Sequence, residues 1–414
     1  MTTRSAAPRA VDDRSAAPRG IGLVVTAVGI MLVAANLRPP VVSVAPLIDV
    51  ISTDQGFSSA TAGLLTALPV LFFGVAAPIA PRLAARYGIE RTIFGSLILL
   101  MAAIFVRLIP SPVALFAGSV FIGVAIGVCN VVLPALIKRD FAHRSGLMTG
   151  LYSMTLSGGA AVAAALTVPI DTALDGNWRM TLGSWAVLAA IALLVWIPQL
   201  SRVHTLTVGE TTPAVWRDPL AWSITVYMGA QSLIFYTFSA WLPQYLIDGG
   251  ATPAHAGNVL ALGQTVALVM SLVAPIIAGR FADQRIVTFG FLAVCAAGFV
   301  GLLTVDGWVP LWASAIMVGP GAGISLALLF MVLRSGSATQ TGQVSGMAQS
   351  VGYVLAAAGP IVIGAVHDAT GSWTAAMAVL AIAVVPQAIA ASFAARDTTM
   401  ASGLAHRHAP GRGR

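Results

Sequence analysis

Twelve apolar runs, each about 20 residues long and separated by short polar breaks, constrain this chain more than any other feature of its sequence. A helix of roughly 20 apolar residues crosses the hydrocarbon core of a bilayer, which is about 30 Å thick. Hydrophobic residues make up 57% of the 414 residues and charged residues only 9%, which is more apolar surface than a soluble fold can bury. We therefore predict an all-α membrane protein in contact with the lipid bilayer. The predicted helices cover residues 20–46, 58–82, 91–109, 112–138, 143–169, 179–199, 218–247, 252–280, 286–305, 308–334, 343–366 and 373–394.

The distribution of basic residues predicts how these helices are oriented. The chain holds 22 Lys and Arg residues and a net charge of +7. They cluster between apolar runs, which is typical of membrane orientation and not of nucleic-acid binding, so we expect no nucleic-acid partner. If the amino terminus is cytoplasmic, nineteen of these basic residues face the cytoplasm. Arg107 and Arg179 fall in loops on the outer side of the membrane, and Arg38 lies inside a span. The pattern predicts a multi-pass protein of the plasma (inner) membrane with both termini cytoplasmic.

The longest internal polar stretch, residues 201–217, divides the chain into two halves of six helices. We predict an N-terminal bundle over residues 20–199, a cytoplasmic linker over 200–217 and a C-terminal bundle over 218–394. The flanking segments 1–19 and 395–414 are predicted to be disordered, basic cytoplasmic tails. A cleaved signal peptide is the alternative for the first run, but the spans that follow favour an uncleaved helix.

The two halves repeat at an offset of about 198 residues. Gly123 and Gly127 in the fourth run correspond to Gly319 and Gly323 in the tenth, and other short matches follow in chain order. Glycines four residues apart allow helices to approach closely. Two parallel repeats predict a pseudo-twofold axis along the membrane normal and a central site between the halves.

The first apolar run is interrupted by Asn36, Leu37, Arg38, Pro39 and Pro40. The two prolines cannot donate the backbone hydrogen bonds that would continue the helix. A charge at this depth costs roughly 3 to more than 10 kcal/mol, so it is normally retained for a function. Broken helices of this kind hold small polar ligands in many transporters. The alternative is that the helix ends here and Arg38 extends to the headgroups.

The sequence offers no cofactor or catalytic motif. Cys129 and Cys295 lie in different halves without a CxxC spacing, so we expect neither a disulfide nor a metal site. There is no P-loop and no nucleophile constellation that would indicate an ATPase or a membrane enzyme. We therefore expect a protein that is not an enzyme and needs no cofactor.

One loop motif carries a recognisable resemblance. The segment 279–285, GRFADQR, resembles the loop signature of the major facilitator superfamily, while its first-half counterpart, 81–88, has Ala85 where an aspartate is usual. The resemblance implies the twelve-helix major facilitator fold in two six-helix halves, alternating access and a monomer. It also implies a gating or structural role for loop residues Arg82, Arg86, Gly88, Gly279, Arg280 and Asp283.

Five further segments narrow the resemblance. Residues 36–39, 231–236, 240–243, 345–353 and 367–373 are similar to the cyanate and 2-nitroimidazole transporter family, and the similarity extends from about Gly20 to Ala394. It implies a secondary transporter of a small polar or anionic solute, which is then the small-molecule partner. Neither the solute nor the direction of transport follows from it.

By analogy with the superfamily, polar residues at mid-depth in the cavity-lining helices are the candidate substrate ligands. The alternative is that such residues only join helices to one another. Gln349 and Tyr353 are four residues apart and share a helical face, whereas Asn36 and Arg38 reach one cavity only if the chain turns at the break. The polar candidates are Asn36, Arg38, Tyr152, Gln231, Tyr236, Gln264, Gln349 and Tyr353. Trp241, near the outer end of its helix, is a further candidate as a stacking surface for a planar ligand, and the alternative is an interfacial tryptophan.

The carboxylates are as informative as the arginine. All 15 Asp and Glu residues fall in loops or at helix ends, whereas proton-driven carriers often bury one at mid-membrane. We therefore expect a positively biased cavity for a small anionic or strongly dipolar planar solute. The alternatives are a multidrug exporter of the same fold and a solute receptor that does not transport.

Overall fold

The computed structural model describes residues 21–57, 59–202, 215–305 and 307–400, and the regular elements in these ranges are all helical. The predicted tail 1–19, most of the predicted linker and residues 401–414 of the second predicted tail lie outside the described residues, whereas residues 395–400 of that tail are described. Short 3-10 turns cover Ala45–Leu47, Ala142–Arg144, Ile197–Arg202 and Val215–Arg217. The α-helices are α1 Ile21–Asn36, α2 Pro39–Val42, α3 Ile48–Gln55, α4 Ser59–Ala76, α5 Ala80–Tyr87, α6 Ile89–Val106, α7 Pro112–Asp140, α8 Ser145–Ala173, α9 Trp178–Ser184, α10 Ala186–Trp196, α11 Pro219–Asp248, α12 Pro253–Ala278, α13 Arg285–Thr304, α14 Val309–Arg334, α15 Ala338–Thr370, α16 Trp373–Ile382 and α17 Val384–Ala394.

The apolar runs become membrane-spanning helices. Among the described residues, ten helical stretches are long and apolar enough to cross a bilayer, and α4 with α5 adds an eleventh that is bent by 56°. α11 has 30 residues and is long enough as well, but polar residues such as Gln231 and Tyr236 lower its mean hydropathy. Each of the twelve predicted spans thus corresponds to one helix or one broken helix, and the prediction of an all-α fold is confirmed.

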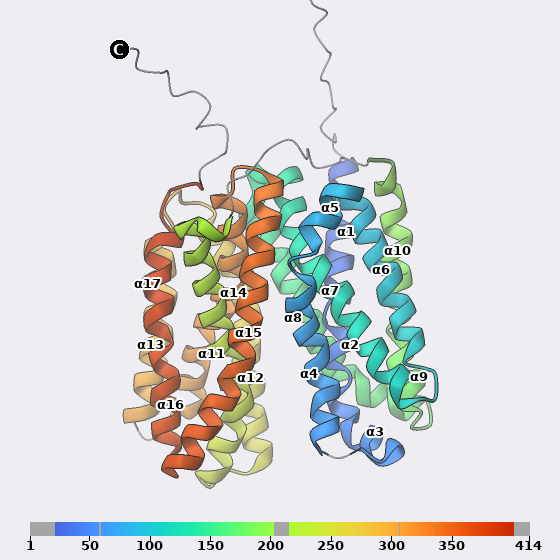
Figure 1. Ribbon diagram of the computed structural model, residues 1–414. Helices are drawn as coiled ribbons and strands as arrows, with labels where there is room; N and C mark the ends of the chain where they lie inside the picture. The colour runs from blue at the N-terminus through green and yellow to red at the C-terminus, as the bar shows by residue number, and fades with distance from the viewer. Residues whose placement is uncertain (1–20, 58, 203–214, 306, 401–414) are drawn as a thin grey trace, which may run out of the picture.

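The helices form two bundles that stand side by side, α1 to α10 in one and α11 to α17 in the other (Figure 1). The start of α1 and the end of α17 lie at the same end of the molecule, which we name the terminal end; α3 and α9 lie at the opposite, distal end (Figure 1). Close glycine contacts build each bundle. A Cβ at Gly123 in α7 would lie 2.6 Å from the Pro69 carbonyl oxygen in α4, and one at Gly319 in α14 would lie 2.6 Å from Cys295 Cβ in α13.

The two bundles approach each other most closely near the terminal end. In α8, a Cβ at Gly146 would lie 2.5 Å from the carbonyl oxygen of Pro275 in α12. In α15, a Cβ at Gly346 would lie 2.9 Å from the carbonyl oxygen of Ala77, between α4 and α5. Ser350 Oγ also donates to the Gly74 carbonyl at 2.9 Å. Helix backbones therefore touch across the interface, and the space between the bundles is closed at this end.

Candidate functional site

The first span is broken where the sequence predicts. α1 ends at Asn36 and α2 begins at Pro39, so Arg38 lies between two helices with a non-helical backbone (φ −121°, ψ −42°). The Arg38 carbonyl accepts hydrogen bonds from the backbone N–H groups of Val41 and Val42 at 3.1 and 3.0 Å. Arg38 and α2 consequently form one short hydrogen-bonded unit that is separate from α1.

A cavity of about 610 Å³ lies beside this break, between the two bundles. Five of the nine predicted ligands line it, and most of the remaining wall is apolar. α2, α8, α11, α12, α14 and α15 contribute to the wall together with the break itself. The lining residues are Arg38, Val42, Leu156, Ser157, Ala160, Ala161, Ala164, Gln231, Ser232, Phe235, Tyr236, Gly257, Leu260, Ala261, Gln264, Thr265, Ala267, Leu268, Ser271, Pro320, Gly321, Ile324 and Tyr353.

Arg38 is the basic residue of the cavity lining and joins the two bundles there. Its Nη1 donates to the Tyr236 hydroxyl of α11 at 3.2 Å, and the Tyr353 hydroxyl of α15 is close enough to interact electrostatically with it. Within the described part of the chain, no Asp or Glu lines the cavity and no carboxylate forms an ion pair with Arg38. The guanidinium therefore has neutral phenol partners and keeps its full charge for a ligand.

Two glutamines add polar groups to the otherwise apolar wall. Gln264 of α12 donates from Nε2 to Ser239 Oγ at 2.9 Å. Gln231 of α11 donates from Nε2 to Ser232 Oγ at 2.6 Å. Phe235 packs edge-on against Tyr236, with ring centroids 5.3 Å apart. The cavity thus combines one cation, several hydrogen-bonding groups and aromatic surface.

Four predicted ligands lie outside the cavity lining. Asn36 is buried and donates from Nδ2 to the carbonyls of Leu32 and Leu188, at 2.8 and 3.2 Å. It therefore fastens α1 to α10. The break in the span does not rotate Asn36 onto the side of Arg38. Trp241 donates to the Pro360 carbonyl at 2.9 Å and contacts Trp373, with ring centroids 5.3 Å apart.

The other two, Tyr152 and Gln349, meet at Asn130 of α7. The Tyr152 hydroxyl of α8 donates to Asn130 Oδ1 at 3.3 Å, and Gln349 Nε2 of α15 donates to the Asn130 carbonyl at 2.8 Å. Gln349 Nε2 also donates to Ser345 Oγ at 2.9 Å. All four residues are buried, so this polar cluster joins the two bundles on the terminal side of the cavity.

The predicted gating residues of the first half make local contacts. Arg82 donates to the Pro78 carbonyl at 3.3 Å, and the Arg86 guanidinium lies over the Tyr87 ring, 5.3 Å from its centroid. Gly88 has φ +86°, a conformation that favours glycine, and its N–H donates to the Ala84 carbonyl at 2.9 Å. These contacts shape the turn from α5 into α6.

In the second half, the predicted loop residues separate into two groups. Gly279 lies in the interface, since a Cβ there would lie 3.0 Å from Gly146 Cα, while the Arg280 side chain is exposed. Asp283 accepts from the backbone N–H of Arg285 at 3.0 Å and pairs with its guanidinium at 2.6 Å. These hydrogen bonds hold the pKa of Asp283 below its usual range.

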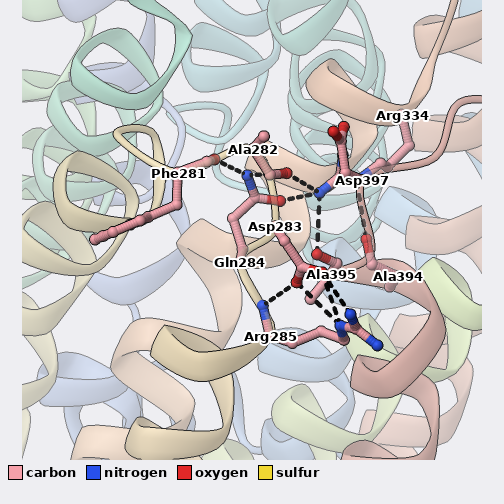
Figure 2. A network of polar contacts seen from close by, with 9 residues as sticks. All are labelled: Phe281, Ala282, Asp283, Gln284, Arg285, Arg334, Ala394, Ala395 and Asp397. Atoms are coloured by element: carbon pink, nitrogen blue, oxygen red, sulfur yellow. Dashed lines mark hydrogen bonds and ion pairs between the residues drawn. The ribbon is translucent and has the colours of Figure 1, made fainter.

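A network around Arg334, at the end of α14, completes this loop (Figure 2). Arg334 donates to the carbonyls of Ala394 and Ala395 at 3.1 and 3.2 Å and to the side-chain oxygen of Gln284 (Figure 2). Asp397 lies 3.7 Å from the same guanidinium. Arg334 thereby fastens the α12–α13 loop to the end of α17 within the second bundle.

Two functional candidates were missed by the sequence analysis. Glu90, at the start of α6, is buried and pairs with Arg139 of α7 at 2.7 Å, and Arg139 also pairs with Asp140 at 2.6 Å. This cluster supplies a charge contact in the first half although Ala85 replaces the usual aspartate. An acid in the first turn of an apolar helix was the available signal. The second is Arg107, which was expected in a loop but is buried.

Comparisons with known proteins agree with this architecture. A family model described as Major Facilitator Superfamily matches residues 21–360. The 2-nitroimidazole transporter of Escherichia coli (strain K12) is 39% identical over 383 residues, which cover 91% of this chain and 97% of that protein. The cyanate transport protein CynX of the same strain is 32% identical over 360 residues, covering 86% and 93%.

A solved structure shows the same fold at lower sequence identity. The fucose:proton symporter FucP of E. coli superposes with a TM-score of 0.71 at 15% identity and covers 90% of this chain and 98% of that one. The family and these relatives are transporters and not enzymes. The matched family model, the two relatives above 30% identity and the paired bundles lead to one conclusion: this chain belongs to the Major Facilitator Superfamily.

Proposed function

We propose that the chain is a secondary transporter that moves a small, planar, anionic or strongly dipolar solute by alternating access, with Arg38 as its principal ligand. The observation that carries the proposal is the Arg38 guanidinium, which lines the cavity without a carboxylate partner among the described residues. A buried cation needs a counter-charge or strong acceptors, and a bound anion supplies them.

The shape and chemistry of the wall support a planar ligand. Guanidinium is planar and binds carboxylate-like groups through two parallel hydrogen bonds. Phe235 and Tyr236 offer flat surface beside it, and Gln231 and Gln264 offer further polar groups. The relatives that are 2-nitroimidazole and cyanate transporters support the same class of solute.

The closure at one end supports alternating access. Near the terminal end the bundles touch through Gly146 and Gly346, whereas the cavity wall extends toward the distal end through Val42 and Gly257. If the termini are cytoplasmic in the plasma membrane, as the basic residues favour, this is an outward-facing arrangement. We further propose that the protein is a monomer, in which the linker over residues 200–217 joins the N-terminal bundle (20–199) to the C-terminal bundle (218–394).

The test is ligand-induced thermal stabilisation and uptake for wild type, Arg38→Ala, Arg38→Lys and the control Arg179→Ala. Arg179 is an arginine outside the cavity, paired with Asp54 at 3.1 Å. The probes are cyanate, nitrite, nitrate, 2-nitroimidazole, benzoate and a cationic dye.

We expect an anion or nitroaromatic to stabilise wild type and Arg179→Ala. Arg38→Ala should lose about 1.5–3 kcal/mol of binding free energy, or roughly 10- to 150-fold in affinity, the usual contribution of a hydrogen bond to a charged group. Arg38→Lys should lose less, because it keeps the charge but not the planar fork. Stabilisation by the cationic dye that is unchanged in Arg38→Ala would contradict the proposal and favour an exporter of cations.

A further inference from the structure

Arg107 is a buried arginine for which the proposed transport function gives no role. It caps the end of α6 and is only 1% exposed. Its Nη1 donates to the Pro40 carbonyl of α2 at 2.6 Å, and its Nε and Nη2 donate to Ser119 Oγ of α7 at 3.2 and 2.8 Å. One guanidinium therefore connects three helices next to the break in the first span.

The surroundings of Arg107 are built to hold it. The Ser119 hydroxyl donates its proton to the Leu115 carbonyl at 2.8 Å, so its lone pairs are free to accept from Arg107. A Cβ at Gly118 would lie 2.8 Å from Arg107 Cγ, so glycine leaves room for the arginine stem. Among the described residues, no carboxylate forms an ion pair with Arg107. Burying a cation without an ion pair is costly, which indicates that these hydrogen bonds serve a purpose.

α2 requires such an anchor. It has four residues, and two of them, Pro39 and Pro40, have no backbone N–H to donate. So short a helix does not persist on its own hydrogen bonds, because nucleation costs more than one turn returns. Its direction must come from outside, and Arg38 is joined to it through the Arg38 carbonyl.

We infer that Arg107 is a positioning residue: by holding the Pro40 carbonyl it fixes α2 and thereby the direction in which Arg38 enters the cavity. The ligand role of Arg38 in this inference rests on the proposed function. The position of α2 does not, so the two can be tested separately.

The first experiment measures α2 without any solute. Val42 lines the cavity at the end of α2, and Val42→Cys is labelled with a negatively charged methanethiosulfonate reagent in detergent. The native Cys129 and Cys295, both buried, are replaced by Ala. Adding Arg107→Gln should change the labelling rate of Val42→Cys at least threefold, whereas the control Arg179→Gln, at an arginine that pairs with Asp54 outside the cavity, should leave it unchanged. Equal rates in all three proteins would overturn the inference.

The second experiment measures the solute concentration for half-maximal uptake in proteoliposomes. Arg107→Gln should raise it about 5- to 20-fold with little change in maximal rate, and it should add nothing in the Arg38→Ala background. If the glutamine variant does not fold, Arg107→Lys replaces it in this experiment. One ammonium cannot bridge Pro40 and Ser119, so the solute concentration for half-maximal uptake should rise two- to fivefold. An unchanged value in both variants, or an additive loss in the Arg38→Ala background, would overturn the link to Arg38.

The two experiments separate the inference from the proposed function. If Arg38→Ala transports normally while Arg107→Gln still changes the labelling of Val42→Cys, the ligand role of Arg38 fails and the anchoring of α2 stands. If Arg38→Ala loses transport while labelling and half-saturation are unaffected by Arg107→Gln, the proposed function stands and Arg107 has no positioning role.

Discussion

The contact of α8 with α12 makes Gly146→Ala a sharp perturbation of the closed terminal end. A Cβ at Gly146 would lie 2.5 Å from the Pro275 carbonyl oxygen and 3.1 Å from Gly279 Cα, closer than van der Waals contact allows. The added methyl group therefore separates the two helices where the bundles meet. It has this effect only in the conformation that is closed at the terminal end, because α8 and α12 must part there when the cavity opens to that side.

The size of the effect follows from packing energetics. Forcing one extra methylene into a close contact costs about 1–3 kcal/mol. A difference of that size changes the ratio of two conformations by roughly 5- to 150-fold. Gly158→Ala is the matched control, since it lies in the same helix and a Cβ there would meet nothing within 4 Å. It carries the general effect of Gly→Ala, about 0.4–1 kcal/mol, without the contact.

The assay is the distance between spin labels on Thr172 of α8 and Asn258 of α12, both exposed near the distal end. The distance distribution of wild type and Gly158→Ala should be dominated by a long component, with the distal ends apart. Gly146→Ala should shift the population toward a shorter one, because the distal end closes as the terminal end opens. Identical distributions for Gly146→Ala and Gly158→Ala would refute the account of the closure.

Two further predictions concern single contacts. Tyr236→Phe removes the hydroxyl that accepts a hydrogen bond from Arg38. The dissociation constant for a small anion, measured by titration calorimetry, should change by a factor of about 2–10, the usual effect of one hydrogen bond. An unchanged dissociation constant would show that the hydroxyl has no influence on the ligand. Glu90→Gln takes from Arg139 its buried partner and should lower the free energy of unfolding by about 1–2 kcal/mol, seen as a lower melting temperature relative to the exposed control Asp368→Asn. Equal melting temperatures for those two variants would rule out a stabilising role for the pair.

Much of the fold was predictable because the bilayer imposes it. Lipid offers no hydrogen bonds, so each apolar run must be a helix, and Pro39 and Pro40 placed the break at the correct residues. The break also identified Arg38, whose charge stands out in an apolar run. The polar residues that lower the mean hydropathy of α11 are also candidate ligands: Gln231 and Tyr236 line the cavity.

The rest depended on which neighbour each helical face meets, and periodicity does not show that. Gln349 and Tyr353 share a face of α15, but four residues separate them by about 6 Å along the axis. Tyr353 therefore reaches the cavity, while Gln349 contacts Asn130 on the terminal side of the cavity. Arg107 was expected in a loop because it follows an apolar run. It is buried because Pro40 and Ser119, which are distant from it in the sequence, accept its hydrogen bonds.

Anomalous diffraction from crystals grown with selenocyanate would show whether an anion binds at Arg38. Selenium gives a signal that identifies the ion without reference to the shape of the density. We expect a selenium peak inside the cavity, with the anion within hydrogen-bonding distance of the Arg38 guanidinium, and the loss of this peak in crystals of Arg38→Ala. A peak elsewhere in the protein at saturating selenocyanate, with none at Arg38, would contradict it.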